Sequence, residues 1–135
     1  VGDGPDKPAV QQHAEELGIA DHILFLGQRS DVNRLYQAFD VFCLPSLYEG
    51  LCIVGVEAQR AGLPCLFADA ITREVDVTKS SRFMSMESVK GWSSFIATLE
   101  SGARVSLSEE MFSDYDISRN AQKLTAMYIK LFEKK

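Results

Sequence analysis

Short apolar runs alternate along the chain with longer amphipathic stretches, and this alternation predicts the order of the elements. Continuous apolar runs of about four residues are typical of parallel strands buried on both faces. Four runs are therefore predicted as strands: Ile23–Leu26, Val41–Leu44, Cys65–Ala68 and a short last one at Phe83–Met86. Strands that alternate with helices at this spacing indicate βαβ units, so the pattern predicts an α/β fold with a parallel sheet.

The stretches between these runs have helical periodicity and carry residues that start and stop helices. Five helices are predicted: Asp6–Leu17, Val32–Phe39, Leu51–Arg60, about Ser88–Leu99, and Ser118–Glu133. Gly18 and Gly62 are expected to close the first and third of these helices. The last helix carries an apolar stripe formed by Ala121, Leu124, Tyr128, Leu131 and Phe132. Its C-terminal end carries cations that the helix dipole favours, namely Lys130, Lys134 and Lys135.

Length, composition and charge limit the class of protein. The chain has 135 residues, of which 46% are apolar, and a formal net charge of −5. This apolar content excludes disorder, and the length suits a single domain over residues 1–135. No apolar run approaches the roughly 20 residues of a membrane helix. The acidic balance disfavours nucleic acid as a partner, because phosphate binding needs a basic surface.

Cysteine and histidine positions limit thiol and metal chemistry. Cys43, Cys52 and Cys65 each lie in an apolar run, which predicts reduced, mostly buried thiols and a cytoplasmic location. His13 and His22 flank a polar helix and are expected at the surface. No metal-binding spacing is present, so neither a metal nor a cofactor is expected. The N-terminus has no apolar region typical of a signal peptide.

The opening glycine turn, Val1–Pro5, suggests a strand-to-helix connection without an initiator methionine. We therefore expect the chain to be a piece of a longer protein. Gly2 and Gly4 match the start of the dinucleotide fingerprint GxGxxG, but Lys7 occupies the position of its third glycine. NAD or FAD binding is accordingly not expected, and a tight turn before the first helix is the alternative.

The segment after the second predicted strand carries the main candidate site, because parallel sheets bind ligands at the carboxyl ends of their strands. Gly50 allows the backbone to approach a ligand without a Cβ in the way. The amides at the start of the next helix lack partners within the helix and form a natural seat for phosphate. These amides belong to Gly50, Leu51, Cys52 and Ile53.

Two carboxylates, Glu49 and Glu57, bracket this helix start. Glu57 is set back by roughly 9 Å at 1.5 Å per residue, which compares with the reach from a sugar diphosphate to its ribose. In this interpretation Glu57 accepts both ribose hydroxyls, and Glu49 meets hydroxyls of a sugar beyond the phosphates. In the alternative, Glu57 pairs with Arg60 at the helix surface and Glu49 is an acid stabilised by the helix dipole.

The spacing Glu49-x7-Glu57, within P-S-x-x-E-G-x6-E-A, resembles the E-x7-E hallmark of the retaining, family 4 glycosyltransferases of the GT-B class. Further segments look like that family in order and spacing: Val1–Pro5, Leu24–Gly27, Ala38–Phe42 and Ala61–Pro64. Together they cover residues 1 to about 76. The resemblance implies the C-terminal, donor-binding half of a GT-B fold, a Rossmann-like parallel sheet with helices on both faces.

The resemblance also implies donor-binding roles for seven residues: Gln28, Arg29, Glu49, Gly50, Leu51, Cys52 and Glu57. Glu57 would bind the ribose, Glu49 the transferred sugar, and the amides after Glu49 the diphosphate. Gln28 and Arg29 would lie against the nucleobase, largely through their backbone. No catalytic residue and no metal is implied. The segment Asp69–Val75 departs from the family pattern, in which many relatives have a glycine pair before a Pro-Glu. It is similar to bacterial exopolysaccharide and capsule members, which favours a UDP-hexose donor.

For the parent protein, the resemblance implies transfer of a hexose to a polysaccharide or lipid-linked glycan acceptor. The acceptor would be bound by an N-terminal domain outside this chain, at the inner face of the cytoplasmic membrane, with peripheral membrane association of the parent. The chain alone is expected to be inactive. Two other functions stay open: a nucleotide-binding or regulatory module such as a receiver domain, for which the opening turn offers only Asp3, and another GT-B enzyme such as a sugar-nucleotide epimerase.

Overall fold

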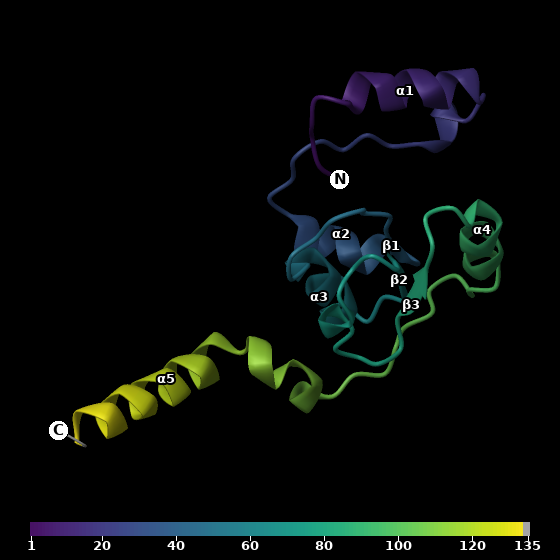
Figure 1. Ribbon diagram of the computed structural model, residues 1–135. Helices are drawn as coiled ribbons and strands as arrows, with labels where there is room; N and C mark the ends of the chain where they lie inside the picture. The colour runs from purple at the N-terminus through teal and green to yellow at the C-terminus, as the bar shows by residue number, and fades with distance from the viewer. Residues whose placement is uncertain (134–135) are drawn as a thin grey trace. The chain divides into compact units, whose positions relative to one another are not determined.

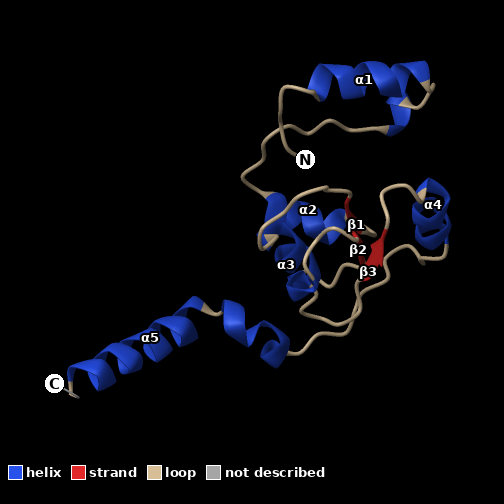
Figure 2. Ribbon diagram, viewed as in Figure 1, coloured by secondary structure: helices blue, strands red, loops and turns tan. Residues whose placement is uncertain are grey.

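Three short parallel strands form the sheet of this chain, of which a computed structural model describes residues 1–133 (Figure 1). The strands are β1 (Phe42–Leu44), β2 (Cys65–Ala68) and β3 (Arg82–Met84), in the order β1-β2-β3 (Figure 2). The register places Phe42 opposite Cys65 and Phe67 opposite Phe83. Every residue of the central strand is buried, as expected of a parallel strand covered on both faces. The predicted α/β, Rossmann-like fold class is confirmed.

Helices follow the strands in the predicted order. They are α1 (Lys7–Glu16), α2 (Val32–Ala38), α3 (Ile53–Arg60), α4 (Val89–Ala97) and α5 (Ile117–Phe132), with single 3-10 segments η1 (Ala20–His22), η2 (Arg73–Val75) and η3 (Glu109–Tyr115). Each predicted helix is present, with boundaries shifted by at most two residues. Gly18 and Gly62 have φ angles of +67° and +77°, which confirms both as the residues that close their helices. The predicted cations Lys134 and Lys135 lie outside the described residues.

The chain divides into two compact units, Val1–Leu35 and Tyr36–Lys135. In the first unit, the opening turn is tied to the segment after α1, because the Gly2 amide donates to the Gly27 carbonyl at 2.7 Å. Lys7, the first residue of α1, pairs with Asp3 of the opening turn, with Nζ and Oδ1 3.4 Å apart. The boundary falls within α2, so that Tyr36 and the three strands, together with α3, α4 and α5, belong to the second unit.

The predicted strand over Ile23–Leu26 is wrong. This segment has no strand conformation, and Leu24 is 81% exposed. Phe25 is also exposed, whereas a strand of a parallel sheet is buried on both faces. A strand is defined by hydrogen bonds to a neighbour, and none of the strands among residues 1–133 pairs with this segment. The apolar run at residues 23–26 is therefore not sufficient evidence of a strand.

A row of aromatic rings crosses one face of the sheet, with the fully buried Phe67 at its centre. The ring centroids of Phe42 and Phe67 are 6.2 Å apart, and those of Phe67 and Phe83 are 5.4 Å apart. Tyr36 extends the row from α2, with its centroid 6.1 Å from that of Phe42. Helix α3 packs against β1 and β2, and its Gly55 lies directly against Phe67. The start of α3, which follows the carboxyl end of β1 along the chain, is thereby held against the sheet.

The free cysteines occupy the interior of the second unit. Cys52 and Cys65 are buried and Cys43 is half-buried, and all three are reduced, as predicted. Burial raises the pKa of the Cys65 thiol to about 12, which keeps it protonated at neutral pH. His13 and His22 are exposed, as the sequence predicted. No helix within residues 1–133 combines the length and the apolar character needed to cross a membrane.

Candidate functional site

The turn from β1 into α3 brings five of the seven predicted site residues together. Glu49, Gly50 and Leu51 are exposed, and Cys52 is the N-cap residue of α3. No side chain caps this helix end. The first amides of α3 consequently lack a side-chain acceptor, and they carry the partial positive charge of the helix dipole. This arrangement can receive an anionic group beside a backbone that Gly50 leaves open.

The thiol of Cys52 does not supply the missing cap. Its pKa is raised chiefly by burial, which outweighs the opposing effect of the Gly55 and Val54 amides. The side chain is only 3% exposed and is held in the core beneath the turn. If Cys52 contacts a ligand, its backbone and not its thiol is the part available to do so.

Glu57 lies about one turn after the first residue of α3 and is exposed, and it has a partner that the sequence did not reveal. Its Oε2 accepts a hydrogen bond from the hydroxyl of Tyr36 at 3.2 Å. That hydroxyl also lies 3.3 Å from the Val54 carbonyl oxygen, so its single hydrogen is shared between two acceptors. Tyr36 is only 4% exposed. The carboxylate is thus exposed to solvent on one side and anchored to the core on the other.

The environment keeps the Tyr36 hydroxyl a donor. Burial, followed by the charge of the Glu57 carboxylate, raises the pKa of Tyr36 from 10.0 to about 12. Both effects disfavour a phenolate, because a second negative charge would be formed in a desolvated place beside the first. At neutral pH the hydroxyl is therefore protonated, within hydrogen-bond distance of both Glu57 and the Val54 carbonyl.

The alternative pairing of Glu57 with Arg60 is wrong. The Arg60 guanidinium instead donates to both carboxylate oxygens of Glu109, at 2.8 Å and 3.0 Å. It also lies over the Phe112 ring, 5.1 Å from the centroid. The basic residue one turn beyond Glu57 is therefore engaged with η3, which leaves the Glu57 carboxylate free of a neighbouring cation on its own helix.

The remaining two predicted residues, Gln28 and Arg29, belong to the first unit and are exposed. Arg29 forms a two-pronged contact with Asp31, with Nε to Oδ1 at 2.8 Å and Nη2 to Oδ2 at 2.7 Å. The hydrogen bond from Arg29 holds the pKa of the Asp31 carboxyl below its ordinary value. Because the Arg29 guanidinium is bound to Asp31, a nucleobase could contact Arg29 only through its backbone. The predicted contact of Gln28 and Arg29 with a nucleobase stays a prediction.

Sequence reasoning missed a buried polar network that fixes α3. The Gln59 amide nitrogen donates to the Val75 carbonyl at 2.7 Å and to the Gly55 carbonyl at 3.0 Å. Its oxygen accepts from the Thr78 amide at 3.1 Å and from the Thr78 hydroxyl at 3.0 Å. Gln59 is 1% exposed, so it fastens the loop after β2 to α3 without access to solvent. The one available signal was a polar residue one helical turn after Gly55 and Val56, on the buried side of α3.

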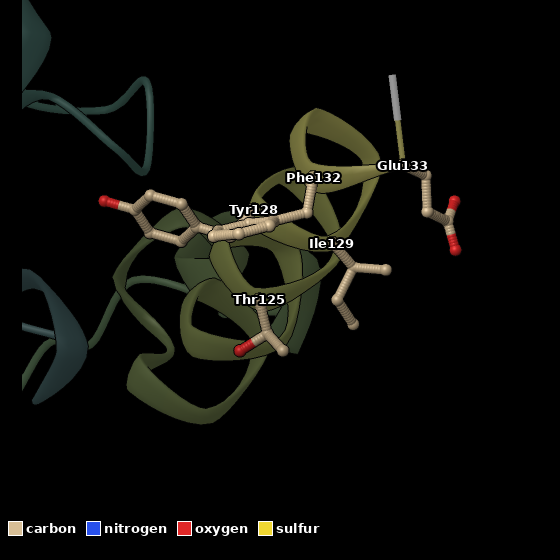
Figure 3. Close-up of a pocket in the computed structure, with 5 residues that line it drawn as sticks. All are labelled: Thr125, Tyr128, Ile129, Phe132 and Glu133. Carbon is tan, nitrogen blue, oxygen red and sulfur yellow. The ribbon is translucent and has the colours of Figure 1, made fainter. Parts of the chain in front are cut away.

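A second surface feature lies on α5, away from the predicted site residues in sequence. A shallow hollow is lined by Thr125, Tyr128, Ile129, Phe132 and Glu133, all from neighbouring turns (Figure 3). The predicted apolar stripe of α5 is exposed, and Phe132 is 79% accessible. A single carboxylate among apolar groups offers no acid–base pair or anion site. Across the described part of the chain, no three His, Cys, Asp or Glu side chains are grouped to hold a metal ion.

The sequence of this chain is similar to a known protein family and to several named proteins. The family model described as "Glycosyl transferases group 1" matches residues 1–81. EpsF of Bacillus subtilis, named as a glycosyltransferase, is 39% identical over 106 residues, which is 77% of this chain and 28% of EpsF. The Vi polysaccharide biosynthesis protein VipC/TviE of Salmonella typhi is 46% identical over 70 residues, 52% of this chain and 12% of its own length.

A third relative is named for its reaction. The UDP-Gal:alpha-D-GlcNAc-diphosphoundecaprenol alpha-1,3-galactosyltransferase of Escherichia coli is 37% identical over 70 residues, 51% of this chain and 18% of that enzyme. The chain therefore spans less than a third of the length of each of these relatives.

Proposed function

Because the chain belongs to the group 1 glycosyl transferase family, we propose that it carries the nucleotide-sugar donor site of a retaining hexosyltransferase. The observation that supports this most is the β1–α3 connection. The uncapped start of α3, whose N-cap residue Cys52 lies two positions after Gly50, is followed roughly 6 Å further along the helix by the anchored Glu57 carboxylate. A nucleoside diphosphate sugar presents a diphosphate and a ribose diol at a comparable separation.

Each part of this connection has a binding task. The amides of Gly50, Leu51 and Cys52 hold the diphosphate, where the helix dipole also favours the negative charge that grows on the leaving group. Glu57 accepts the two ribose hydroxyls, and Glu49, before the turn, accepts hydroxyls of the transferred sugar. Gln28 and Arg29 contact the nucleobase through their backbone. These residues bind and orient the donor, and no metal or other cofactor is assigned to them.

The donor and acceptor proposals draw on the relatives. EpsF, VipC/TviE and the Escherichia coli galactosyltransferase carry names that refer to glycosyl transfer or to polysaccharide and lipid-linked glycan synthesis. We propose a UDP-hexose as donor and a polysaccharide or lipid-linked glycan as acceptor, with the transfer at the cytoplasmic face of the membrane. Because the chain spans only 28% of EpsF, we expect donor binding from it but no turnover.

A nucleotide titration followed by NMR tests the donor site. UDP should shift the amide signals of residues 50–53 more strongly than GDP or ADP at equal concentration. Glu57→Ala should weaken UDP binding about tenfold or more, because a charged acceptor of two hydrogen bonds is removed. Glu87→Ala, which removes an exposed carboxylate elsewhere in the second unit, is the control and should bind as the wild type does.

Two results would contradict the proposal. One is shifts of residues 50–53 that are the same for UDP, GDP, ADP and inorganic phosphate. The other is wild-type affinity of Glu57→Ala for UDP, which would return Glu57 to the role of a surface residue.

A further inference from the structure

The contact between Tyr36 and Glu57 joins two elements separated by 21 residues and extends the proposed site into the core. We propose that Tyr36 is a positioning residue, whose hydroxyl holds the Glu57 carboxylate in the orientation that receives the donor's two ribose hydroxyls. This inference rests on the proposed function. It adds a residue to the site that never touches the ligand and was outside the sequence prediction.

The ring of Tyr36 is fixed before any ligand arrives. It meets the Phe39 ring edge-on, with centroids 6.4 Å apart, and the Phe42 ring, with centroids 6.1 Å apart. Edge-to-face contacts of this kind are favourable for aromatic pairs. Phe42 is in turn part of β1, so the sheet sets the place of the hydroxyl. A group mounted in this way can serve as a fixed point for a mobile side chain.

Glu57 is such a mobile side chain. An exposed glutamate on a helix samples several staggered rotamers, and its terminal torsion is broad. Acceptance of two neighbouring hydroxyls requires both carboxylate oxygens in one orientation. Among residues 1–133, Tyr36 is the side chain hydrogen-bonded to Glu57, and it occupies one position on Oε2. A carboxylate has about four acceptor positions, so Oε1 and the rest of Oε2 are left for the ribose.

A second role of Tyr36 must be distinguished from this one. Its hydroxyl also reaches the Val54 carbonyl, and its ring packs in the core, so it contributes to the folding of the second unit. A purely structural residue would affect every ligand of the site alike. A positioning residue affects only those ligands whose ribose hydroxyls meet Glu57, and this difference defines the experiment.

The test combines a variant of the chain with a variant of the ligand. UDP and 2′,3′-dideoxy-UDP are titrated into the wild type and into Tyr36→Phe, and dissociation constants are measured by NMR or calorimetry. Tyr36→Phe should weaken UDP about five- to tenfold, as expected for one hydrogen bond to a charged group. It should leave the affinity for the dideoxy analogue unchanged. Tyr128→Phe removes an exposed hydroxyl from α5 and should change neither constant.

An equal loss of affinity for both ligands, or no loss for UDP, would overturn the positioning role while the donor site stands. A wild type that does not bind UDP would overturn the proposed function and this inference with it. If Tyr36→Phe does not fold, the orientation of the Glu57 side chain can be measured in the wild type instead. Side-chain coupling constants of Glu57 should report one dominant rotamer without ligand, and averaged couplings would contradict the inference.

Discussion

Replacing Gly55 by alanine tests how closely α3 lies on the sheet. A Cβ at this position would stand 2.8 Å from Cε1 of Phe67 and 2.9 Å from Cγ2 of Val75. Ordinary van der Waals contacts begin at 3.4 Å, so the nearer contact is short by 0.6 Å. Phe67 is fully buried at the centre of the aromatic row and cannot move aside without disturbing its neighbours. The helix must therefore shift outward, and strain is expected.

The size of the effect is a balance of two terms. Overpacking a filled core costs about 1–3 kcal/mol. Alanine gains about 1 kcal/mol over glycine inside a helix. With a rigid aromatic ring as the neighbour, we expect the upper half of the first range and a net loss of about 1–2 kcal/mol. For a chain of this length that loss lowers the melting temperature by roughly 3–8 °C.

Thermal and urea unfolding, followed by circular dichroism, measure this loss. Gly50→Ala is the matched control, because its Cβ would have nothing within 4 Å and its φ angle is not in the left-handed region. We expect it to stay within about 0.5 kcal/mol of the wild type. A Gly55→Ala chain as stable as the wild type, or more stable by the helix term, would refute the close packing of α3 on β2.

Three further predictions concern the second unit. Gln59→Leu should cost at least about 2 kcal/mol in urea unfolding, because the Thr78 amide and hydroxyl lose their buried acceptor, and a neutral result would contradict the network. Arg60→Ala should cost less than about 1 kcal/mol, since its pair with Glu109 is at the surface, and a larger loss that persists in 1 M salt would contradict this. Stability should fall as pH rises from about 10 toward 12, because the folded chain holds the Tyr36 proton more tightly than the unfolded one; curves that run parallel for wild type and Tyr36→Phe would show that another group is responsible.

The elements that local patterns determine were predictable. The central strand β2 follows from four consecutive apolar residues between Pro64 and Asp69. Helix α3 follows from apolar periodicity with Gly62 beyond its end. Its predicted start at Leu51 was two residues early, because Cys52 is the N-cap residue and Ile53 is the first helical residue. Such signals are short in range and need no knowledge of neighbours.

Pairing between distant segments was not predictable in the same way. Ile23–Leu26 has the same apolar pattern as β2, yet it forms no ladder, because a strand depends on a hydrogen-bonding partner that its own sequence does not encode. The contact of Tyr36 with Glu57 is a similar case. A buried tyrosine hydroxyl and a carboxylate on an apolar helix each needed a partner, and matching the two across 21 residues required the fold.

The three buried or half-buried thiols give this chain internal reporters of its own motions. Cys52 directly precedes the first turn of α3, and Cys65 lies in the central strand; burial raises the pKa of both thiols. Each thiol must be exposed by local unfolding before an alkylating reagent can react with it, so its alkylation rate reports how often that part of the structure opens. Opening of the turn that would hold the diphosphate is read at Cys52, and opening of the sheet at Cys65. A donor bound at the turn would slow the alkylation of Cys52 more than that of Cys65, so binding could be followed without adding a label to the chain.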